Sequence, residues 1–419
     1  MKQKLKRVII LNPQGYVEKN PPLGKTDTGG QTVYILNLAK ALSKKNIKVD
    51  IFTRYFDHYE KQEELINDKV KIIRIPAGKK KFIPKERLYE VMPEFAEKIM
   101  LYLHKTKKKP QIIHSHYWDG GYAGILLSKM LDIPHINTSH TFGKVKKLKM
   151  KIEKVSREKL VSAYRFHVRI AIEQKIFNKA DAILVLCETS RIQLLHYYIV
   201  DFEKIKVIYP GVDIDIFNPR KNALDKKIQL KENSILTMSR LVPAKGIDRL
   251  IEALNLIKKS INFNLYIGGD INSQNASKEE KATKKLLLDL IEKYHLKDRV
   301  TFLGQLNHKE VAAYYRNTDL FVLPSRYEPF GLTTMEAMAC GSICLISNVA
   351  GSKEVIIDGL NGFVIDMHDR KLFAKKILDI LKNKKNNRKI AQNAVFTIKQ
   401  HYSWEKIVDN IINFYSSLL

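Results

Sequence analysis

Short runs of β-branched and other apolar residues alternate with amphipathic stretches along the chain, and this alternation limits the possible folds more than any other feature. The amphipathic stretches, such as 31–42 and 245–258, place apolar residues three and four positions apart, as in helices. Such alternation predicts parallel sheets with helices on both faces, and therefore an α/β fold. The expected strands are 8–11, 49–53, 70–75, 112–114, 182–186, 205–208, 235–238, 265–267, 300–303, 320–323 and 342–346.

The alternation falls into two series. The first ends at the turn-rich segment 209–213 (YPGVD), and a new strand–helix series begins near residue 235. A chain of 419 residues is long enough for two or three domains. We therefore expect domains at 1–212 and 213–400, followed by an amphipathic C-terminal helix within 401–419. Because ligands of such folds bind at the carboxyl ends of strands, motifs that follow strands predict one cleft between two domains.

Charge and cysteine content narrow the function classes. The formal net charge is +29, but the basic clusters at 79–81, 107–109, 144–151 and 382–385 are dispersed, without an RNA-binding motif. Nucleic acid is therefore disfavoured as a partner, and weak adhesion to an anionic membrane surface is the better alternative. Cys187, Cys340 and Cys344 lie in apolar runs and fit no metal spacing, so we expect them to be reduced and buried.

Targeting segments are not evident in the sequence. No apolar run approaches the ~20 residues of a membrane helix. The basic start is followed only by the short run 8–11, which is too short for a signal-peptide core and indicates a first strand. We therefore expect a cytoplasmic protein.

Glu328 and Glu336 frame the segment 327–341 (YEPFGLTTMEAMACG). Pro329 and Gly331 argue against one continuous helix, so we expect Glu328 in a loop after strand 320–323 and a helix that starts near Thr333 or Thr334. Free N–H groups at such a helix start suit a diphosphate, and the two carboxylates suit sugar hydroxyls. The alternative is that Glu336 complements the helix dipole and Glu328 is a solvated loop residue.

The whole segment resembles the nucleotide-sugar signature of the retaining glycosyltransferase family 4, which has the GT-B fold of two Rossmann-like domains facing each other across a cleft. The resemblance implies that Glu328 contacts the transferred hexose and that Glu336 holds the ribose. It also implies that the amides of Gly331, Leu332 and Thr333 face the diphosphate. For the whole chain it implies that domain 1–212 binds the acceptor, that domain 213–400 binds the nucleotide sugar, and that the helix within 401–419 crosses back to the first domain.

A second motif, 239–246 (SRLVPAKG), follows the expected strand 235–238. Arg240 and Lys245 would place two cations where a leaving nucleoside diphosphate carries its charge. The alternative is a pair of surface cations, which are common in a chain with 73 lysines and arginines. The corresponding positions in the family favour the donor site.

A Gly-Gly turn lies between the first strand and the following helix. Gly29 and Gly30 would let an anion approach the backbone closely, although this is not the dinucleotide fingerprint because a third glycine is missing. The longer strings 14–24 and 27–34 resemble the sucrose-phosphate synthase group, and within it most closely the mannosylfructose-phosphate synthases. The resemblance implies donor contacts for Gly29 and Gly30 and an acceptor contact for Gln31.

Histidines follow two further strands, in segments 114–121 (HSHYWDGG) and 138–146 (TSHTFGKVK). The resemblance implies that His140 donates to hexose hydroxyls beside the reaction centre, while His116 and Asp119 line the acceptor side. His114 and His135 are expected to be structural. His116 and Asp119 could also suggest a metal, but no second carboxylate cluster accompanies them, and the family needs no bound metal or other cofactor.

Three cations in separate motifs of the first half could bind an acceptor phosphate: Lys85, Lys146 and Arg169. In the sucrose-phosphate synthase group the matching residues hold the 6-phosphate of fructose. A guanidinium offers forked donors that suit phosphate oxygens, and lysines act as point charges. Val168 departs from the group, in which related enzymes often carry a second arginine.

The resemblance thus implies a retaining hexosyltransferase that uses GDP-mannose or UDP-glucose as donor and fructose 6-phosphate as acceptor, forming a phosphorylated non-reducing disaccharide. No residue is expected to act as a covalent nucleophile. One alternative is a family 4 enzyme with an inositol-phosphate or lipid-linked acceptor. Another, of a different class, is a non-catalytic basic binding protein on a transferase fold, against which the intact Glu328, Glu336 and His140 argue.

Overall fold

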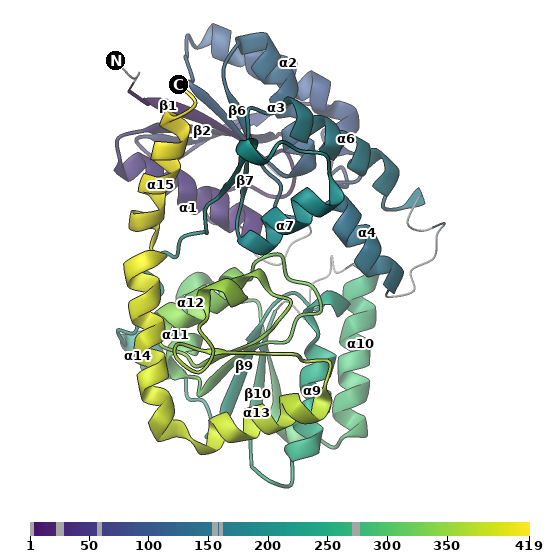
Figure 1. The fold of residues 1–419 in the computed structure, drawn as a ribbon, viewed down its shortest axis with the longest axis vertical. Helices are drawn as coiled ribbons and strands as arrows, with labels where there is room; N and C mark the ends of the chain where they lie inside the picture. The colour runs from purple at the N-terminus through teal and green to yellow at the C-terminus, as the bar shows by residue number, and fades with distance from the viewer. Residues whose placement is uncertain (1–3, 22–28, 57–60, 153–157, 159–161, 270–276) are drawn as a thin grey trace. The chain divides into compact units, whose positions relative to one another are not determined.

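The computed structural model describes residues 4–21, 29–56, 61–152, 158, 162–269 and 277–419 (Figure 1). The chain forms two compact units. Unit 1 contains the described residues up to Gly211 together with Ile407–Leu419, and unit 2 contains Val212–Lys406. The C-terminal helix α15 (Trp404–Ser416) therefore belongs to unit 1 from Ile407 onward.

The described part of unit 1 is built on an eight-stranded sheet with the order β3-β4-β2-β1-β5-β6-β7-β8. Its ladders are parallel except for the antiparallel pairing of β3 with β4 at one edge. The strands are β1 (Arg7–Leu11), β2 (Lys48–Arg54), β3 (Glu63–Asn67), β4 (Val70–Ile75), β5 (Ile112–His116), β6 (His135–Thr138), β7 (Ala182–Val185) and β8 (Ile205–Val207).

Apolar side chains from the sheet and its helices form the core of unit 1. Ile9 and Ile113 of neighbouring strands pack with Phe95 and Ile99 of α2, and all four side chains are fully buried. The helices of this unit, besides α15, are α1 (Gly30–Lys44), η1 (Leu88–Val91), α2 (Met92–Lys105), α3 (Tyr117–Leu131), α4 (Gly143–Ile152), α6 (Phe166–Lys179), α7 (Glu188–Tyr197) and η2 (Phe202–Lys204).

Unit 2 has a six-stranded parallel sheet in its described part, with the order β11-β10-β9-β12-β13-β14. The strands are β9 (Ser234–Met238), β10 (Asn264–Gly268), β11 (Val300–Gly304), β12 (Leu320–Leu323), β13 (Cys344–Ser347) and β14 (Phe363–Ile365). The helices are α8 (Ala223–Lys227), η3 (Pro243–Lys245), α9 (Ile247–Ile257), α10 (Lys278–Lys293), η4 (Lys297–Arg299), α11 (His308–Asn317), α12 (Leu332–Cys340), η5 (Gly351–Val355), α13 (Arg370–Lys382) and α14 (Lys384–His401).

The expected α/β class, with helices packed on mostly parallel sheets, is confirmed. Strands 70–75 and 320–323 have the predicted bounds, but β3, β6 and β14 were not predicted. Edge strand β3 carries charged residues, β14 has only three residues, and β6 (HINT) is buried although polar, so none shows a long apolar run. No helix in the described ranges is both long and apolar enough to cross a bilayer.

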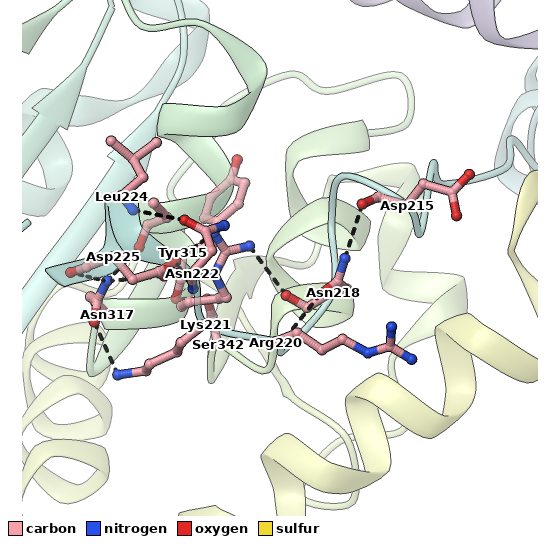
Figure 2. Close-up of polar contacts among 12 residues, drawn as sticks. Asp215, Asn218, Arg220, Lys221, Asn222, Leu224, Asp225, Tyr315, Asn317 and Ser342 are labelled. Carbon is pink, nitrogen blue, oxygen red and sulfur yellow. Dashed lines mark hydrogen bonds and ion pairs between the residues drawn. The ribbon is translucent and has the colours of Figure 1, made fainter.

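A buried ion pair in unit 2 connects helix α8 to helix α11, and Figure 2 shows the polar contacts around it. The Arg316 guanidinium donates to both carboxylate oxygens of Asp225, at 2.6 and 3.0 Å, and their side chains are only 3% and 2% exposed. Asp225 also accepts a bond from the Asn222 amide at 2.8 Å, in the capping box of α8. One carboxylate therefore anchors both α8 and α11.

Asp225→Ala should lower the free energy of unfolding of unit 2 by about 3–5 kcal/mol, because it leaves the buried Arg316 charge without its partner. Urea denaturation followed by circular dichroism measures this change. Asp289→Ala is the control, since the Lys285–Asp289 pair is 80% and 59% exposed and should contribute about 0–1 kcal/mol. Equal losses in the two variants would contradict the anchoring role.

Candidate active site

In each sheet some of the predicted site residues follow strands at or next to the point where the strand order reverses. In unit 2, β9 and β12 are neighbours, with β10 and β13 on their outer sides. In unit 1, β1 and β5 are neighbours in the same way, and β6 lies next to β5. Because loops diverge at such a reversal, the carboxyl ends of these strands leave room for a ligand.

Lys245 and Glu328 form an ion pair in unit 2. The Lys245 ammonium donates to the Glu328 carboxylate, and the two side chains are only 20% and 11% exposed. Glu328 lies in the loop between β12 and α12, as predicted, and the Ser325 hydroxyl donates to the same carboxylate at 3.3 Å. The structure thus brings together two residues from separate sequence motifs.

Backbone contacts hold the two motifs together. The Ala244 carbonyl accepts bonds from the amides of Arg326 and Tyr327, at 2.8 and 3.2 Å. Gly246 has a φ of +66°, and a Cβ there would lie 2.0 Å from the Pro324 carbonyl oxygen. Only glycine therefore allows this close approach of the two loops.

Helix α12 starts with free amides beside Glu328. Gly331, its N-cap, has a φ of +99° and no side chain to cap the helix. Among the described residues no acceptor bonds the amides of Leu332 and Thr333. The helix starts at Leu332, one residue before the predicted range, and its unbonded amide donors suit an anion such as a diphosphate.

Glu336 lies on α12 among buried neighbours. Burial raises the pKa of its carboxyl group to about 7, so the group titrates near neutral pH. The neighbouring Tyr315 side chain is fully buried, and its hydroxyl has no hydrogen-bond partner in the described structure. A carboxylate retained in such surroundings costs stability when it is ionised, which is typical of binding sites.

Arg240 follows β9 and is exposed. Within the described ranges no carboxylate pairs with its guanidinium. It is therefore a solvated cation available to an anionic ligand, whereas Lys245 is paired with Glu328.

Three histidines meet in unit 1 at the ends of β5 and β6. His116 Nδ1 lies 3.0 Å from His140 Nε2, and the rings of His114 and His116 have centroids 4.3 Å apart. Burial lowers the pKa of His114 and of His140 to about 3 and that of His116 well below its usual value. All three rings are therefore neutral at physiological pH and act as hydrogen-bonding groups rather than cations.

The backbone is strained where this cluster leaves the sheet. Tyr117 and His140 follow neighbouring strands with φ of +64° and +33°, in a region that non-glycine residues rarely occupy. Such strain costs of order 1–3 kcal/mol per residue and persists only where the surroundings enforce it.

Arg169 and Glu173 enforce the conformation. Arg169 donates to the Tyr117 hydroxyl at 2.7 Å, to the Thr141 carbonyl at 2.8 Å and to Glu173 at 2.8 Å. Glu173 accepts the Gly143 amide at 2.9 Å. Arg169 is 4% exposed, so in this structure its guanidinium is occupied by the loop that carries His140. Its predicted contact with an acceptor phosphate remains a prediction.

The two lysines that are predicted to bind the acceptor phosphate also lie in unit 1. Lys85 is half-buried, 4.0 Å from Glu86, and its charge acts on the Tyr117 hydroxyl. Lys146 lies over the Tyr164 ring at 5.7 Å.

The remaining predicted site residues of unit 1 have contacts close to the ends of β1 and β5. Asp119 accepts the Gly120 amide at 2.7 Å, and Gln31 donates to Asn12 at 2.6 Å. Gly29 precedes α1, which starts at Gly30, and a Cβ at Gly29 would meet no described atom within 4 Å. Residues 22–28 of the Gly-Gly motif lie outside the described residues.

Sequence reasoning missed several supporting residues: Tyr34, Tyr117, Glu173 and Tyr415. Tyr34 packs edge-on against His116 and His140, at 5.8 and 5.5 Å between ring centroids. Arg169 and Glu173 share a helical face at i and i+4, the one signal that could have revealed this pair. No group of three or more His, Cys, Asp or Glu side chains in the described ranges could hold a metal ion.

Two family models match this chain, one over most of unit 1 and the other over most of unit 2. Residues 28–216 match the model described as Glycosyltransferase Family 4, and residues 220–395 match the model described as Glycosyl transferases group 1. The mannosylfructose-phosphate synthase of Agrobacterium fabrum is 30% identical over 97% of this chain and 90% of its own length. A D-inositol 3-phosphate glycosyltransferase of Corynebacterium efficiens is 28% identical over 98% and 95%. The solved structure of sucrose-phosphate synthase from Thermosynechococcus elongatus superposes with a TM-score of 0.86, at 28% identity and 99% coverage of both chains.

Gly331→Ala should destabilise unit 2 and weaken binding of a nucleoside diphosphate. The new Cβ would lie 3.0 Å from Leu323 Cδ2 and 3.0 Å from Ser352 Oγ, in addition to the unfavourable φ, and would displace the first amides of α12. Gly359→Ala is the matched control, because its φ is +76° but no described atom lies within 4 Å of the added Cβ.

The control should lose only the backbone term, roughly 1–2 kcal/mol, and should keep its affinity for the nucleotide. Urea denaturation and calorimetric titration with UDP and GDP measure both properties. The assignment of the α12 amides is wrong if Gly331→Ala binds both nucleotides as tightly as the native protein.

Proposed function

We propose that this chain, which belongs to glycosyltransferase family 4 and has the GT-B fold, transfers a hexose from a nucleotide sugar to fructose 6-phosphate. The transfer would retain the configuration of the hexose. The product would be a phosphorylated non-reducing disaccharide of the mannosylfructose-phosphate or sucrose-phosphate type. The donor would be GDP-mannose or UDP-glucose.

The Lys245–Glu328 ion pair beside the start of α12 is the observation that carries this proposal. A diphosphate bound at the α12 amides would compete with Glu328 for the Lys245 ammonium. Glu328 would then have oxygens free to accept hydroxyl groups of the hexose. The negative charge that grows on the leaving diphosphate would be stabilised by Lys245, by the exposed Arg240 and by the helix amides.

Unit 1 would supply the acceptor side. Its histidines are neutral, so His140 would orient hexose hydroxyls by hydrogen bonding and would not carry a charge. Lys85 and Lys146 would provide the positive charge for the 6-phosphate. The names of the relatives support a phosphorylated acceptor, since mannosylfructose-phosphate synthase, sucrose-phosphate synthase and D-inositol 3-phosphate glycosyltransferase each carry a phosphate in their names.

An inositol phosphate is the second candidate acceptor. The D-inositol 3-phosphate glycosyltransferase similarity extends over 98% of the chain and therefore includes unit 1. Lys85 and Lys146 could bind the phosphate of either acceptor. Fructose 6-phosphate and an inositol phosphate would then be distinguished by their rings and not by their phosphates.

An activity screen tests the proposal. GDP-mannose and UDP-glucose are each combined with fructose 6-phosphate, fructose and inositol 3-phosphate, and disaccharide formation is followed by mass spectrometry. Fructose 6-phosphate should be the best acceptor, because fructose cannot form charge-assisted hydrogen bonds with the lysines through a phosphate. Lys146→Met should raise the KM for fructose 6-phosphate but not the KM for the donor, whereas Lys147→Met on the same helix is the matched control. Equal use of fructose and fructose 6-phosphate, or use of neither, would overturn the acceptor assignment.

The affinity for nucleoside diphosphate should depend on pH through Glu336. Its pKa of about 7 means that the carboxylate proposed to accept ribose hydroxyls is mostly protonated at pH 6 and mostly ionised at pH 8. Affinity should therefore fall by roughly tenfold from pH 8 to pH 6. Calorimetric titration at the two values measures this change.

Two variants serve as controls for this titration. Glu336→Gln should lose the part of the pH dependence that comes from the protein and retain only that of the ligand's own phosphate. Arg240→Gln should bind more weakly at both pH values but keep the native dependence. The ribose assignment fails if Glu336→Gln and the native protein share one pH profile.

A further inference from the structure

A chain of buried polar contacts links the C-terminal helix to the histidines of unit 1. The Tyr415 hydroxyl on α15 lies 2.6 Å from His114 Nδ1, and His114 Nε2 lies 2.8 Å from Thr138 Oγ1. Thr138 ends β6, two residues before His140. Tyr415, His114 and Thr138 are all fully buried.

The directions of these hydrogen bonds follow from the protonation states. Burial is the main cause that lowers the pKa of His114 to about 3, with smaller effects of His140 and His135, so its ring carries one N–H. Burial also raises the pKa of Tyr415 well above its usual value, so the phenol keeps its proton. Among the described residues only His114 is within hydrogen-bonding distance of that hydroxyl. A buried O–H without an acceptor is costly, so Tyr415 donates to Nδ1 and His114 donates from Nε2 to Thr138.

The His114 ring is connected to His140 in two ways, through the backbone and through side chains. Along the backbone, Thr138 precedes the strained residue His140, whose φ is +33°. Through side chains, the His114 ring packs against His116 at 4.3 Å, and His116 Nδ1 contacts His140 Nε2 at 3.0 Å. The His116 Nε2 atom is buried without a partner in the described structure.

The unpartnered Nε2 atom of His116 indicates the direction of the hydrogen bond between His116 and His140. An orphaned N–H costs more than an orphaned lone pair, so the proton of His116 lies on Nδ1, which donates to His140 Nε2. The remaining proton of neutral His140 is then on Nδ1, and His140 has one free donor for a ligand. The tautomer of His140 thus depends on its contact with the buried His116 ring.

We propose that Tyr415 is a positioning residue: its hydroxyl fixes the tautomer of His114, and the His114 ring, which packs against His116, holds the His116–His140 pair in place. The inference rests on the proposed function, in which His140 donates to a hexose hydroxyl. Packing of α15 does not require the hydroxyl, because Ile407, Val408 and Ile411 already bury the helix and phenylalanine would fill nearly the same volume as tyrosine. The hydroxyl adds only the hydrogen bond to His114.

Tyr415→Phe tests the proposal, with Ile411→Val as the matched control. Ile411 is fully buried on the same helix, so its shortening loosens the packing of α15 and changes no hydrogen bond. The first measurement is ¹⁵N NMR of histidine-labelled protein, which distinguishes ring nitrogens that carry a proton from those that do not. It requires no substrate and is therefore independent of the acceptor.

Tyr415→Phe should shift the ring nitrogen signals of His114 and of His140, and Ile411→Val should leave both in place. Unchanged His140 signals in Tyr415→Phe, or equal shifts in the control, would overturn the proposal whatever the enzyme's acceptor proves to be. If instead the signals shift but no donor–acceptor pair reacts, the proposed function fails and the coupling of the rings stands.

The second measurement is steady-state kinetics with the donor and acceptor that the screen identifies. Tyr415→Phe should lower kcat by about 2- to 30-fold, the range found for residues that act through others, with the KM for the donor unchanged. Ile411→Val should retain the native kcat. A loss of kcat that is equal in the two variants would assign Tyr415 a packing role only.

Discussion

Parallel strand pairing is the constraint on which both halves of the candidate site depend. In a parallel sheet every strand points its carboxyl end to the same edge, so segments distant in sequence meet there. In unit 2 this brings the loop after β9, with Arg240 and Lys245, against the loop after β12, with Glu328. In unit 1 it brings the ends of β5 and β6, and therefore His116 and His140, into contact.

The site residues are held in states that cost stability. His140 and Tyr117 have strained backbones, Glu336 is a carboxylate with a raised pKa, and His116 has a buried nitrogen without a partner in the described structure. Natural proteins tend to break local rules at functional sites and to compensate for them elsewhere. Here the buried Arg169–Glu173 network compensates in unit 1.

The positively charged residues of the chain have different roles, which depend on their burial and on their partners. Arg316 and Arg169 are buried and paired with carboxylates, so they stabilise the fold locally. Lys245 is largely buried and paired with a carboxylate that is itself a predicted site residue, while Arg240 is exposed. The net charge of +29 therefore does not identify the functional cations; their partners and burial do.

The sequence by itself determined the α/β class, most strands, the family and the residues at strand ends, because apolar periodicity and local motifs are readable along the chain. It did not reveal β6, since a buried polar strand has no apolar run. Only the tertiary structure decided the partners: Lys245 with Glu328, Arg169 with Glu173 and Tyr117, and Tyr415 with His114. A contact such as that between residues 114 and 415 depends on how the chain returns to unit 1, and no local pattern encodes that path.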